Sequence, residues 1–308
     1  MDISIIISTR NRAQSLAQTL DSFNTVDVPT GATAEILVVD NGSTDHTREV
    51  TQKQKLANFS IRYLLEERPG KMWAQNRGLA AAQGTVIFTT DDDVRPAKNW
   101  LEMMVRPLLA RDCDAAVGRI LLADDLRRPW MTENYRAYVA WYDGGEPLDL
   151  IGANMGFHRR VLERVPQFDT EIGPGALGFY DDALFGWQLE EAGFRVRYIP
   201  EASVVHHADQ ARLLRRNCLS DGQKFGASQA YILHHWRHEK LAAPRLRYGY
   251  LALKLMLRRL VKPPPPQDAE GAPPWEASYV AGMAKCRQFL IERRRPRNYT
   301  KRGLRKET

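Results

Sequence analysis

Four short hydrophobic segments recur in the first hundred residues, and polar segments with helical spacing separate them. Each is rich in β-branched residues and has the length of a strand that is covered on both faces of a sheet. The segments are ISIIIS (residues 3–8), EILVVD (35–40), IRYLLE (61–66) and TVIFTT (85–90). Leu16, Leu20 and Phe23 lie at helical spacing after the first segment, and the Ala-rich residues 73–84 precede the fourth. This alternation predicts βαβ units, a parallel sheet and right-handed crossovers.

Polar residues follow three of these predicted strands, at the point where each strand ends. They are STRNR (residues 8–12), DNGSTD (40–45) and three consecutive aspartates (91–93). In a parallel sheet these ends share one edge, where ligands bind. Asp40 is placed to accept hydrogen bonds from a ribose or a base, although Asp-Asn-Gly is equally typical of an ordinary turn. Lys71 and Arg77 lie near the same edge and would meet a diphosphate there, unless their segment is an exposed loop and a solvated helix start.

Asp91, Asp92 and Asp93 place three like charges directly after a hydrophobic strand, and such repulsion calls for a cation. Mg²⁺ or Mn²⁺ binds carboxylate, phosphate and water oxygens and would offset this repulsion. The alternative is a helix N-terminus, because aspartates favour the helix dipole and residues 96–104 have a helical composition. One aspartate would suffice for a helix, so the sequence favours a divalent metal site.

Basic residues are concentrated in the last third of the chain. The net charge is +7, and residues 210–308 hold 22 Lys+Arg against 7 Asp+Glu, while residues 1–209 carry an acidic excess. Residues 245–262 form an amphipathic helical pattern with an apolar face and a basic stripe. This profile is typical of an interfacial membrane helix and equally of a helix that packs on the α/β domain. Pro263 begins a predicted stiff linker, and the basic residues 292–308 are predicted to be disordered and drawn to an anionic leaflet.

Composition and terminal sequence exclude several classes of protein. The chain of 308 residues suffices for one large α/β domain with an extension. Its three widely separated cysteines imply neither a disulfide framework nor a zinc cluster, and they fit a reducing cytosol. The N-terminal apolar run lacks a basic leader and a cleavage site, so we interpret it as a strand, and no apolar run approaches the roughly 20 residues that span a bilayer. A basic tail without a recognised binding motif does not favour nucleic acid as a partner.

Four segments together resemble family 2 glycosyltransferases with the GT-A fold. They are SIIISTRNR, ILVVDNGSTD, PGKMWAQNRGLAAAQGTVIFTTDDDV and the stretch from GANMGF through YDDALFGWQL to ASVVHH, in this order within residues 2–207. An ordered set of motifs is far more specific than any single one. The resemblance implies a single nucleotide-binding α/β domain with a mostly parallel sheet. It also implies a nucleotide-diphosphate sugar donor, a manganese or magnesium ion, and transfer with inversion at the anomeric carbon.

The resemblance assigns donor and metal roles to residues at the strand ends. The residues expected to contact the nucleotide sugar are Thr9, Arg10, Asn11, Asp40, Lys71, Arg77, Asp91 and Asp92. The triple aspartate takes the place of the D-x-D motif, with Asp93 as the expected direct metal ligand and Asp91 as a second. In related enzymes a histidine near this point joins the metal. We assign that role to His207, although the sequence does not distinguish it from His206.

The resemblance also assigns residues to the acceptor side. Asp182 stands where the family has its catalytic base, and Asp181 replaces the more usual glutamate as an acceptor contact. The chemistry requires a base independently, because the acceptor hydroxyl must lose a proton as it attacks the anomeric carbon. The alternative for this acidic pair is a helix N-cap. Asn154 is expected to contact the acceptor, and aromatic residues between positions 124 and 152 either stack on sugar rings or belong to the core.

These expectations divide the chain into three parts. Residues 1–207 are the predicted catalytic domain, residues 208–262 a helical and membrane-associating extension, and residues 263–308 a Pro-rich linker with a basic tail. The predicted function is metal-dependent sugar transfer to a saccharide or lipid-linked acceptor in cell-surface polysaccharide or glycolipid synthesis, in the cytoplasm and at the inner membrane face. A catalytically inactive sugar-nucleotide-binding scaffold is the alternative, followed by a nucleic-acid-binding protein.

Overall fold

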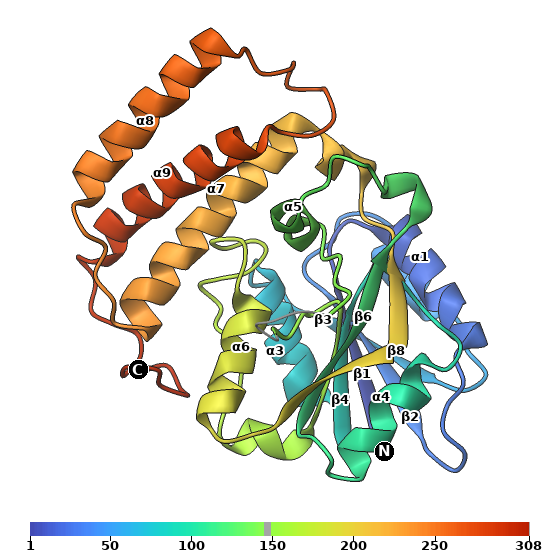
Figure 1. Cartoon of the computed structure of the whole chain (residues 1–308). Coiled ribbons are helices and arrows are strands. Elements are labelled where there is room, and N and C mark those ends of the chain that lie inside the picture. The colour runs from blue at the N-terminus through green and yellow to red at the C-terminus, as the bar shows by residue number, and fades with distance from the viewer. Residues whose placement is uncertain (145–148, 308) are drawn as a thin grey trace. The chain divides into compact units, whose positions relative to one another are not determined.

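The computed structural model describes residues 1–144 and 149–307. The chain forms two compact units (Figure 1). The first unit is Met1–Ala123, Ala140–Thr170 and Asp181–His207, and the second is Asp124–Val139, Glu171–Tyr180 and Ala208–Thr308. The predicted domain 1–207 is therefore not one unit, because two of its segments belong with the C-terminal helices. The predicted aromatic stretch between positions 124 and 152 is divided as well, and its residues 145–148 lie outside the described residues.

A mixed sheet forms the centre of the first unit, with strand order β3-β2-β1-β4-β7-β6-β8-β5. The strands are β1 (Ile3–Thr9), β2 (Ala34–Asp40), β3 (Ser60–Leu65), β4 (Val86–Asp91), β5 (Val94–Pro96), β6 (Ala115–Leu122), β7 (Asn154–His158) and β8 (Val196–His206). The first four strands pair in parallel, as the alternating pattern predicts. β7 runs antiparallel between β4 and β6. The prediction of an α/β fold with a mostly parallel central sheet is thus confirmed, and β7 and β5 supply its antiparallel pairings.

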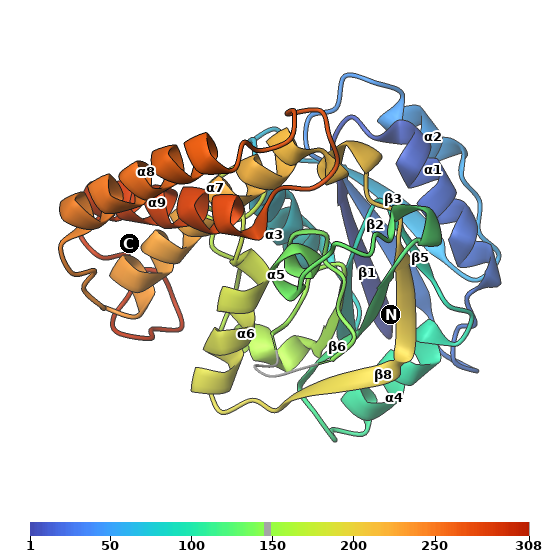
Figure 2. The same ribbon diagram turned by 45° about the horizontal axis from the view of Figure 1, so that its top comes forward.

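Helices cover both faces of this sheet. They are α1 (Ala13–Ser22), α2 (Thr47–Lys53), α3 (Lys71–Ala81), α4 (Trp100–Leu109) and α6 (Asp181–Glu191). Figure 2 shows α1, α2 and α4 on one face and α3 and α6 on the other. Ile5 packs with Leu20 and Trp100 in the core beneath α1 and α4. Successive residues of a strand face opposite ways, so Ile6 faces α3, where a Cβ on Gly78 would lie only 2.5 Å from it. Gly78 therefore lets α3 lie close to the sheet.

β8 has a partner strand on each side. β8 pairs in parallel with β6 and, at its carboxyl end, antiparallel with β5. β5 begins directly after the three aspartates and is three residues long, so the chain turns back there and brings this turn beside the end of β8. β5 could not be predicted from the sequence, because three residues that include Arg95 and Pro96 are too few to show an alternation of hydrophobic and polar residues.

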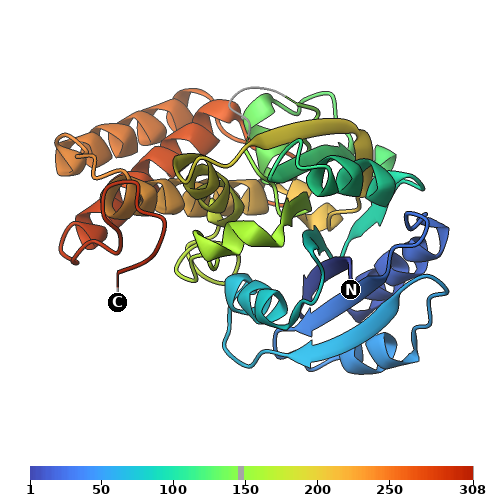
Figure 3. The ribbon, with the colours of Figure 1, turned by 90° about the horizontal axis from the view of Figure 1, so that it is seen from below.

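Three long helices dominate the second unit: α7 (Arg215–Tyr231), α8 (Pro244–Val261) and α9 (Pro274–Glu292), with the shorter α5 (Glu133–Tyr138) beside α7. Figures 1 and 3 show α9 between α7 and α8. At Gly226 of α7 a Cβ would lie 2.0 Å from the carbonyl oxygen of Ala281, so glycine permits close contact with α9. A π-helical turn, Ile232–Trp236, follows α7. Within the described residues, no helix combines the length and apolar character that a membrane span requires.

The Pro-rich residues 262–273 connect α8 to α9 without a helix or strand of their own, but the prediction of a disordered tail after them is wrong. The segment after residue 273 contains α9, and the residues after α9 pack within the second unit. Trp236 Nε1 donates to the carbonyl oxygen of Gly303 at 3.1 Å. Glu171 accepts hydrogen bonds from Lys306 Nζ at 2.6 Å and from Asn298 Nδ2 at 2.9 Å. Composition suggested disorder because the acidic and carbonyl partners of these basic residues lie far away in the sequence.

Candidate active site

The three consecutive aspartates lie where β4 ends and the chain turns into β5. Thr9, at the end of the neighbouring β1, donates its hydroxyl to Asp92 Oδ2 at 2.7 Å. Arg12 follows β1 and places Nη1 2.9 Å from Asp92 Oδ1 and Nη2 2.7 Å from Asp93 Oδ2. The polar ends of β1 and β4 therefore meet at one edge of the sheet.

Cationic side chains compensate the charges of these aspartates. Lys71, the first residue of α3, forms an ion pair with Asp91, while Arg12 pairs with Asp92 and Asp93. Burial raises the pKa of Asp92 to about 6, although the charge of Arg12 opposes this rise. Burial acts in the same direction on Asp93, but the nearby imidazole of the last residue of β8 and the Arg12 guanidinium hold the pKa of Asp93 below its ordinary value. The repulsion at the strand end is thus offset by groups of the chain itself.

His206, the last residue of β8, joins this cluster in place of the predicted His207. In the β5–β8 pairing His206 lies opposite Val94. Its imidazole is buried, and Nε2 lies 3.2 Å from Asp93 Oδ1. The side chain of His207 is exposed, while its backbone N–H donates to the Asp93 carbonyl oxygen at 2.8 Å. Because side chains alternate along a strand, only one of two successive histidines can face the aspartates, and the choice of His207 is corrected.

Asp91, Asp93 and His206 form a group that fits a divalent metal ion. One ligand atom from each lies within 4.8 Å of the others. Oδ1 of Asp93 is buried and faces the His206 imidazole at 3.2 Å without a well-aligned hydrogen bond. A buried carboxylate oxygen without a well-aligned hydrogen bond is rare in folded proteins, and carboxylate with imidazole is a common ligand set for divalent metals. Asp92 lies outside this group, because Thr9 and Arg12 occupy both of its carboxylate oxygens.

α6 begins with Asp181 and Asp182. The sequence predicts Asp181 as an acceptor contact and Asp182 as the catalytic base. Asp182 Oδ2 accepts the backbone N–H of Gly152 at 2.8 Å, and Oδ1 accepts the backbone N–H of Ala183 at 2.8 Å. Burial raises the pKa of both carboxyls, and the charge of Asp182 adds to this effect on Asp181. A carboxylate with a raised pKa is a stronger base than an exposed one, which suits proton transfer near neutral pH.

Lys71 connects the two acidic groups. Its ammonium pairs with Asp91. Burial opposes protonation of Lys71, but the charges of Asp91, Asp181 and Asp182 together hold its pKa above the ordinary value. The start of α3 is fixed by Asn41, whose Oδ1 accepts the backbone N–H of the residue before Lys71 at 2.9 Å. The loop after β2 therefore positions the cation that both acidic groups share.

The remaining predicted donor residues lie on the loops after β1 and β2. Asp40 ends β2 and is buried; its Oδ1 accepts a backbone N–H of its own loop, and its Oδ2 accepts the Tyr63 hydroxyl, each at 2.8 Å. Asn11 has a positive φ of 52°, and its Oδ1 accepts the backbone N–H of Thr44 at 2.7 Å. This bond ties the two loops together. Arg10 stands beside Asn11 with an exposed side chain.

Sequence reasoning chose Arg77 and missed Arg12. Arg77 is exposed, and its charge acts on the carboxylate of Glu66. It follows Lys71 by six positions on α3, so the two side chains lie on different sides of the helix. The role of Arg77 beside the diphosphate is therefore not supported. The available signal for Arg12 was its place in STRNR, directly after a strand whose neighbour ends in three acids.

The predicted acceptor contact through Asn154 is wrong. Its side chain is completely buried. Oδ1 accepts the indole N–H of Trp100 at 2.7 Å, and Nδ2 donates to the carbonyl oxygens of Arg119 at 2.9 Å and Ala202 at 3.0 Å. These three bonds commit the amide to holding α4, β6 and β8 together, so no group of Asn154 is left for an acceptor.

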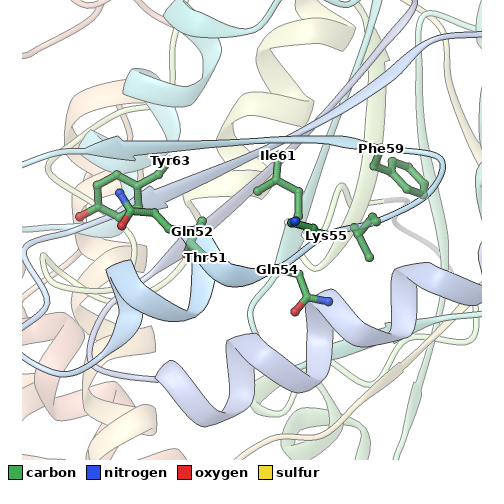
Figure 4. A pocket seen from close by; sticks show the side chains of 8 residues that line it. Thr51, Gln52, Gln54, Lys55, Phe59, Ile61 and Tyr63 are labelled. Atoms are coloured by element: carbon green, nitrogen blue, oxygen red, sulfur yellow. The ribbon is translucent and has the colours of Figure 1, made fainter.

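A separate pocket of about 530 Å³ lies between α2 and β3 (Figure 4). Its lining residues are Thr51, Gln52, Gln54, Lys55, Leu56, Phe59, Ile61 and Tyr63. Tyr63 links it to the donor side through its bond to Asp40. None of these lining residues is acidic, so this pocket is distinct from the group formed by the aspartates.

The fold is that of GT-A glycosyltransferases. The mannosyltransferase PcManGT from Pyrobaculum calidifontis, in complex with GDP-Man and Mn²⁺, matches 92% of this chain and 69% of its own, with a TM-score of 0.53 and 20% identity. S. aureus TarS 1-349 in complex with UDP matches 96% and 92%, with a TM-score of 0.53 and 17% identity. At these identities the likeness shows the fold alone.

The sequence comparison defines the family. Residues 4–165, more than half of the chain, match the model of glycosyl transferase family 2, and the chain belongs to this family of enzymes. An uncharacterized glycosyltransferase of Nostoc sp., alr2836, is 42% identical over 181 residues, which are 55% of this chain and 54% of that protein. Glucosyl-3-phosphoglycerate synthase of Mycobacterium tuberculosis is 28% identical over 159 residues, 48% of this chain and 45% of that protein. The matches thus span about half the length of these curated relatives.

Proposed function

We propose that this glycosyltransferase moves a sugar from a nucleotide-diphosphate sugar to a hydroxyl acceptor, with inversion at the anomeric carbon. One observation carries the proposal: Asp182 accepts the N–H of Gly152, whose carbonyl oxygen accepts the Thr89 hydroxyl on β4, the strand that ends in Asp91, the partner of Lys71. A single inverting displacement needs two acidic sites, one that serves the departing diphosphate and one that takes the acceptor proton. These contacts bring two such sites together.

The donor would bind at the strand ends. Thr9, Arg10, Asn11 and Asp40 occupy the linked loops after β1 and β2, and we assign them to the nucleotide. The bond between Asn11 and the loop after β2 supports this, because it holds both loops in one arrangement. PcManGT and TarS are described with GDP-Man and with UDP, respectively, which supports a nucleotide-sugar donor here.

Asp91, Asp93 and His206 would hold a divalent metal, manganese or magnesium. When bound there, the ion would neutralise the charge that develops on the leaving diphosphate. The short separation of Asp93 Oδ1 and the His206 imidazole, both buried, supports this site. Arg12 and Lys71 place positive charge beside the same carboxylates and would bind phosphate oxygens directly.

Asp182 is the proposed catalytic base. The acceptor hydroxyl oxygen forms a bond to the anomeric carbon, the bond from that carbon to the diphosphate oxygen breaks with its electron pair on the diphosphate, and the hydroxyl proton passes to the Asp182 carboxylate. The N–H groups of Gly152 and Ala183 hold that carboxylate in place. Asp181 lies next to it and is the proposed acceptor contact.

For the acceptor, we propose a saccharide or a lipid-linked molecule in cell-surface polysaccharide or glycolipid synthesis. We place the enzyme in the cytoplasm, at the inner face of a membrane. The buried, free thiols of Cys113, Cys218 and Cys286 support a reducing compartment.

A nucleotide-sugar screen tests the proposal. We expect one donor among UDP- and GDP-sugars to bind, and to be hydrolysed slowly in the absence of acceptor, only when Mn²⁺ or Mg²⁺ is present. The absence of binding to every donor would refute the proposal. Tight metal-dependent binding without transfer to any acceptor and without hydrolysis would instead identify an inactive sugar-nucleotide-binding scaffold.

A further inference from the structure

One side of α8 carries a continuous row of exposed apolar side chains. These residues, which we call the outer face of α8, are Leu246, Tyr250, Leu253, Met256, Leu257, Leu260 and Val261. Their exposed fractions range from 49% at Leu257 to 87% at Val261. Scattered exposed leucines are normal, but a contiguous apolar patch of this kind marks an interaction surface.

The opposite side of α8 already has its packing partner within the second unit. Leu255 is buried, and Leu251 approaches α9 so closely that a Cβ on Gly282 would lie 2.9 Å from its side chain. Arg259, one helical turn after Leu255, donates to Glu276 of α9 at 2.6 Å and 2.8 Å. The helix therefore buries one side against α9, and the outer face is what remains.

Basic residues border the outer face. Arg247, Lys254 and Arg258 lie along one edge and Arg245 along the other, since a helix turns about 100° per residue. α8 contains no acidic residue. Within the part of the chain that the structure describes, no carboxylate forms an ion pair with these four cations. Lys254 lies over the Tyr250 ring at 4.5 Å and Arg258 over a tryptophan ring of α9 at 5.0 Å, contacts that leave their positive charge uncompensated.

We propose that α8 lies flat on an anionic lipid bilayer and inserts its outer face into the boundary between headgroups and acyl chains. The helix has 18 residues, so its axis is about 27 Å long, which gives a row of apolar contacts in the membrane plane rather than a span. Arg247, Lys254 and Arg258 on the border would reach lipid phosphates. This combination of apolar face and basic border is what an anionic membrane surface selects.

The charges decide against a second copy of this chain as the occupant. Leu246, Tyr250, Leu253, Leu257 and Leu260 are spaced alternately by four and three residues, a spacing that also suits a pair of helices. Two copies joined through this face would bring their basic borders together with no acidic residue on either helix to offset them. On an anionic bilayer the basic border of each copy would instead face negatively charged lipid headgroups, which attract it.

Flotation with lipid vesicles tests the surface. The full chain is mixed, at about 0.1 M salt, with vesicles of phosphatidylcholine alone or with about 30% phosphatidylserine, a composition that mimics an anionic leaflet. The apolar variant is Leu253→Gln with Leu257→Gln, and the charge variant is Arg247→Gln with Lys254→Gln. The matched control is Leu109→Gln, because Leu109 on α4 is exposed to a similar extent, 46%, in the other unit.

We expect the chain to bind anionic vesicles about tenfold or more tightly than neutral ones, and each double variant to lose about tenfold in binding, while the Leu109 variant binds normally. Circular dichroism should show all variants folded, since the changed side chains are exposed. Wild-type binding by the apolar variant would overturn the proposal. Equal binding to both vesicle types would also overturn it. A third such result would be a wild-type dimer that the change of Leu253 and Leu257 to Gln converts to monomers while vesicle binding stays the same. Flotation needs no donor, so its failure is distinguishable from failure of the transferase proposal.

Discussion

Replacing Asp182 by asparagine separates the two tasks that its carboxylate performs. As the proposed base it would receive a proton; as a hydrogen-bond acceptor it holds the backbone N–H groups of Gly152 and Ala183, each at 2.8 Å. Asparagine has nearly the same shape but cannot take up a proton at neutral pH, and it offers one oxygen instead of two. The variant therefore loses the proposed chemistry completely and the structural hydrogen bonds only in part.

The structural loss can be worked out from these contacts. One of the two N–H groups would face the asparagine NH₂ and lose its acceptor, which costs about 1–3 kcal/mol when the group is buried. Asp182 is half-buried, so water can replace part of that bond. In addition, the variant no longer buries a charge that the site disfavours, as the raised pKa of Asp182 shows. We therefore expect the free energy of unfolding to fall by about 1 kcal/mol.

The catalytic loss should be much larger. General base catalysis contributes about 10²–10⁴-fold, which corresponds to about 3–5 kcal/mol in the activation free energy. The assay is the initial rate of transfer with the donor that the screen identifies, together with calorimetric titration of that donor in the presence of Mn²⁺. We expect kcat to fall by about that factor while donor affinity stays within about threefold of wild type, because Asp182 does not contact the metal group.

Asp114→Asn is the matched control. Asp114 is a buried carboxylate at the start of β6, at the end of the sheet away from the site, and it accepts the backbone N–H of Arg195 at 2.9 Å and pairs with Arg160. Its substitution should destabilise the protein at least as much as the change at Asp182 and leave kcat nearly unchanged. Two results would refute the reasoning: loss of Mn²⁺-dependent donor binding in Asp182→Asn, which would place this residue on the donor side, or near wild-type kcat.

Three further predictions concern metal binding, stability and the acceptor. His206→Ala should weaken Mn²⁺ binding in calorimetry by about tenfold or more, and His207→Ala should not; equal losses would contradict the choice of ligand. Burial opposes ionisation of Glu292, but hydrogen bonds from His235 and Gln288 lower its pKa to about 2 from 4.5. Glu292→Gln should therefore lower the free energy of unfolding in urea by about 3 kcal/mol near neutral pH. This loss should shrink as the pH falls from 4.5 through 2, because the wild-type carboxylate then becomes protonated. A loss that does not change with pH would contradict the prediction. Asn154→Ala should destabilise the fold by about 2 kcal/mol or more without raising KM for the acceptor, and a raised KM at unchanged stability would restore its predicted role.

The features that could be predicted from the sequence are those that depend on how hydrophobic and polar residues alternate over a few positions. Short β-branched segments separated by helical spacing define parallel strands, and parallel strands bring their carboxyl ends to one edge. Asp40, Asp91 and Asp93 could therefore be assigned to one edge of the sheet from the sequence alone. The motifs around them also identified the family, because they occur together and in order.

The features that failed depend on which way a side chain faces and on partners far away in the sequence. His206 and the next residue, His207, face opposite ways at the end of β8. Which of them faces the aspartates depends on the pairing of β8 with β5, and β5 is too short to be predicted from the sequence. Asn154 looked like an available amide because the Trp100 indole that occupies its oxygen lies 54 positions away. In the sequence, Arg12 and Arg77 each offer one positive charge and cannot be ranked. The structure distinguishes them, because Arg77 lies on a different side of α3 from Lys71.

The same distinction separates the two basic segments of the second unit. Charge composition predicted membrane attraction for both α8 and the residues after α9. In the structure Arg295 pairs with Glu171 at 2.6 Å and with Glu292 at 2.9 Å, and Lys306 pairs with Glu171 at 2.6 Å, so these cations already have partners within the unit. The cations on the border of the outer face of α8 have no carboxylate partner among the described residues. Truncation after residue 262 would remove α9, against which α7 and α8 both pack, and would report on folding rather than on lipid binding. Substitution on the outer face of α8 is therefore the experiment that isolates the membrane contact.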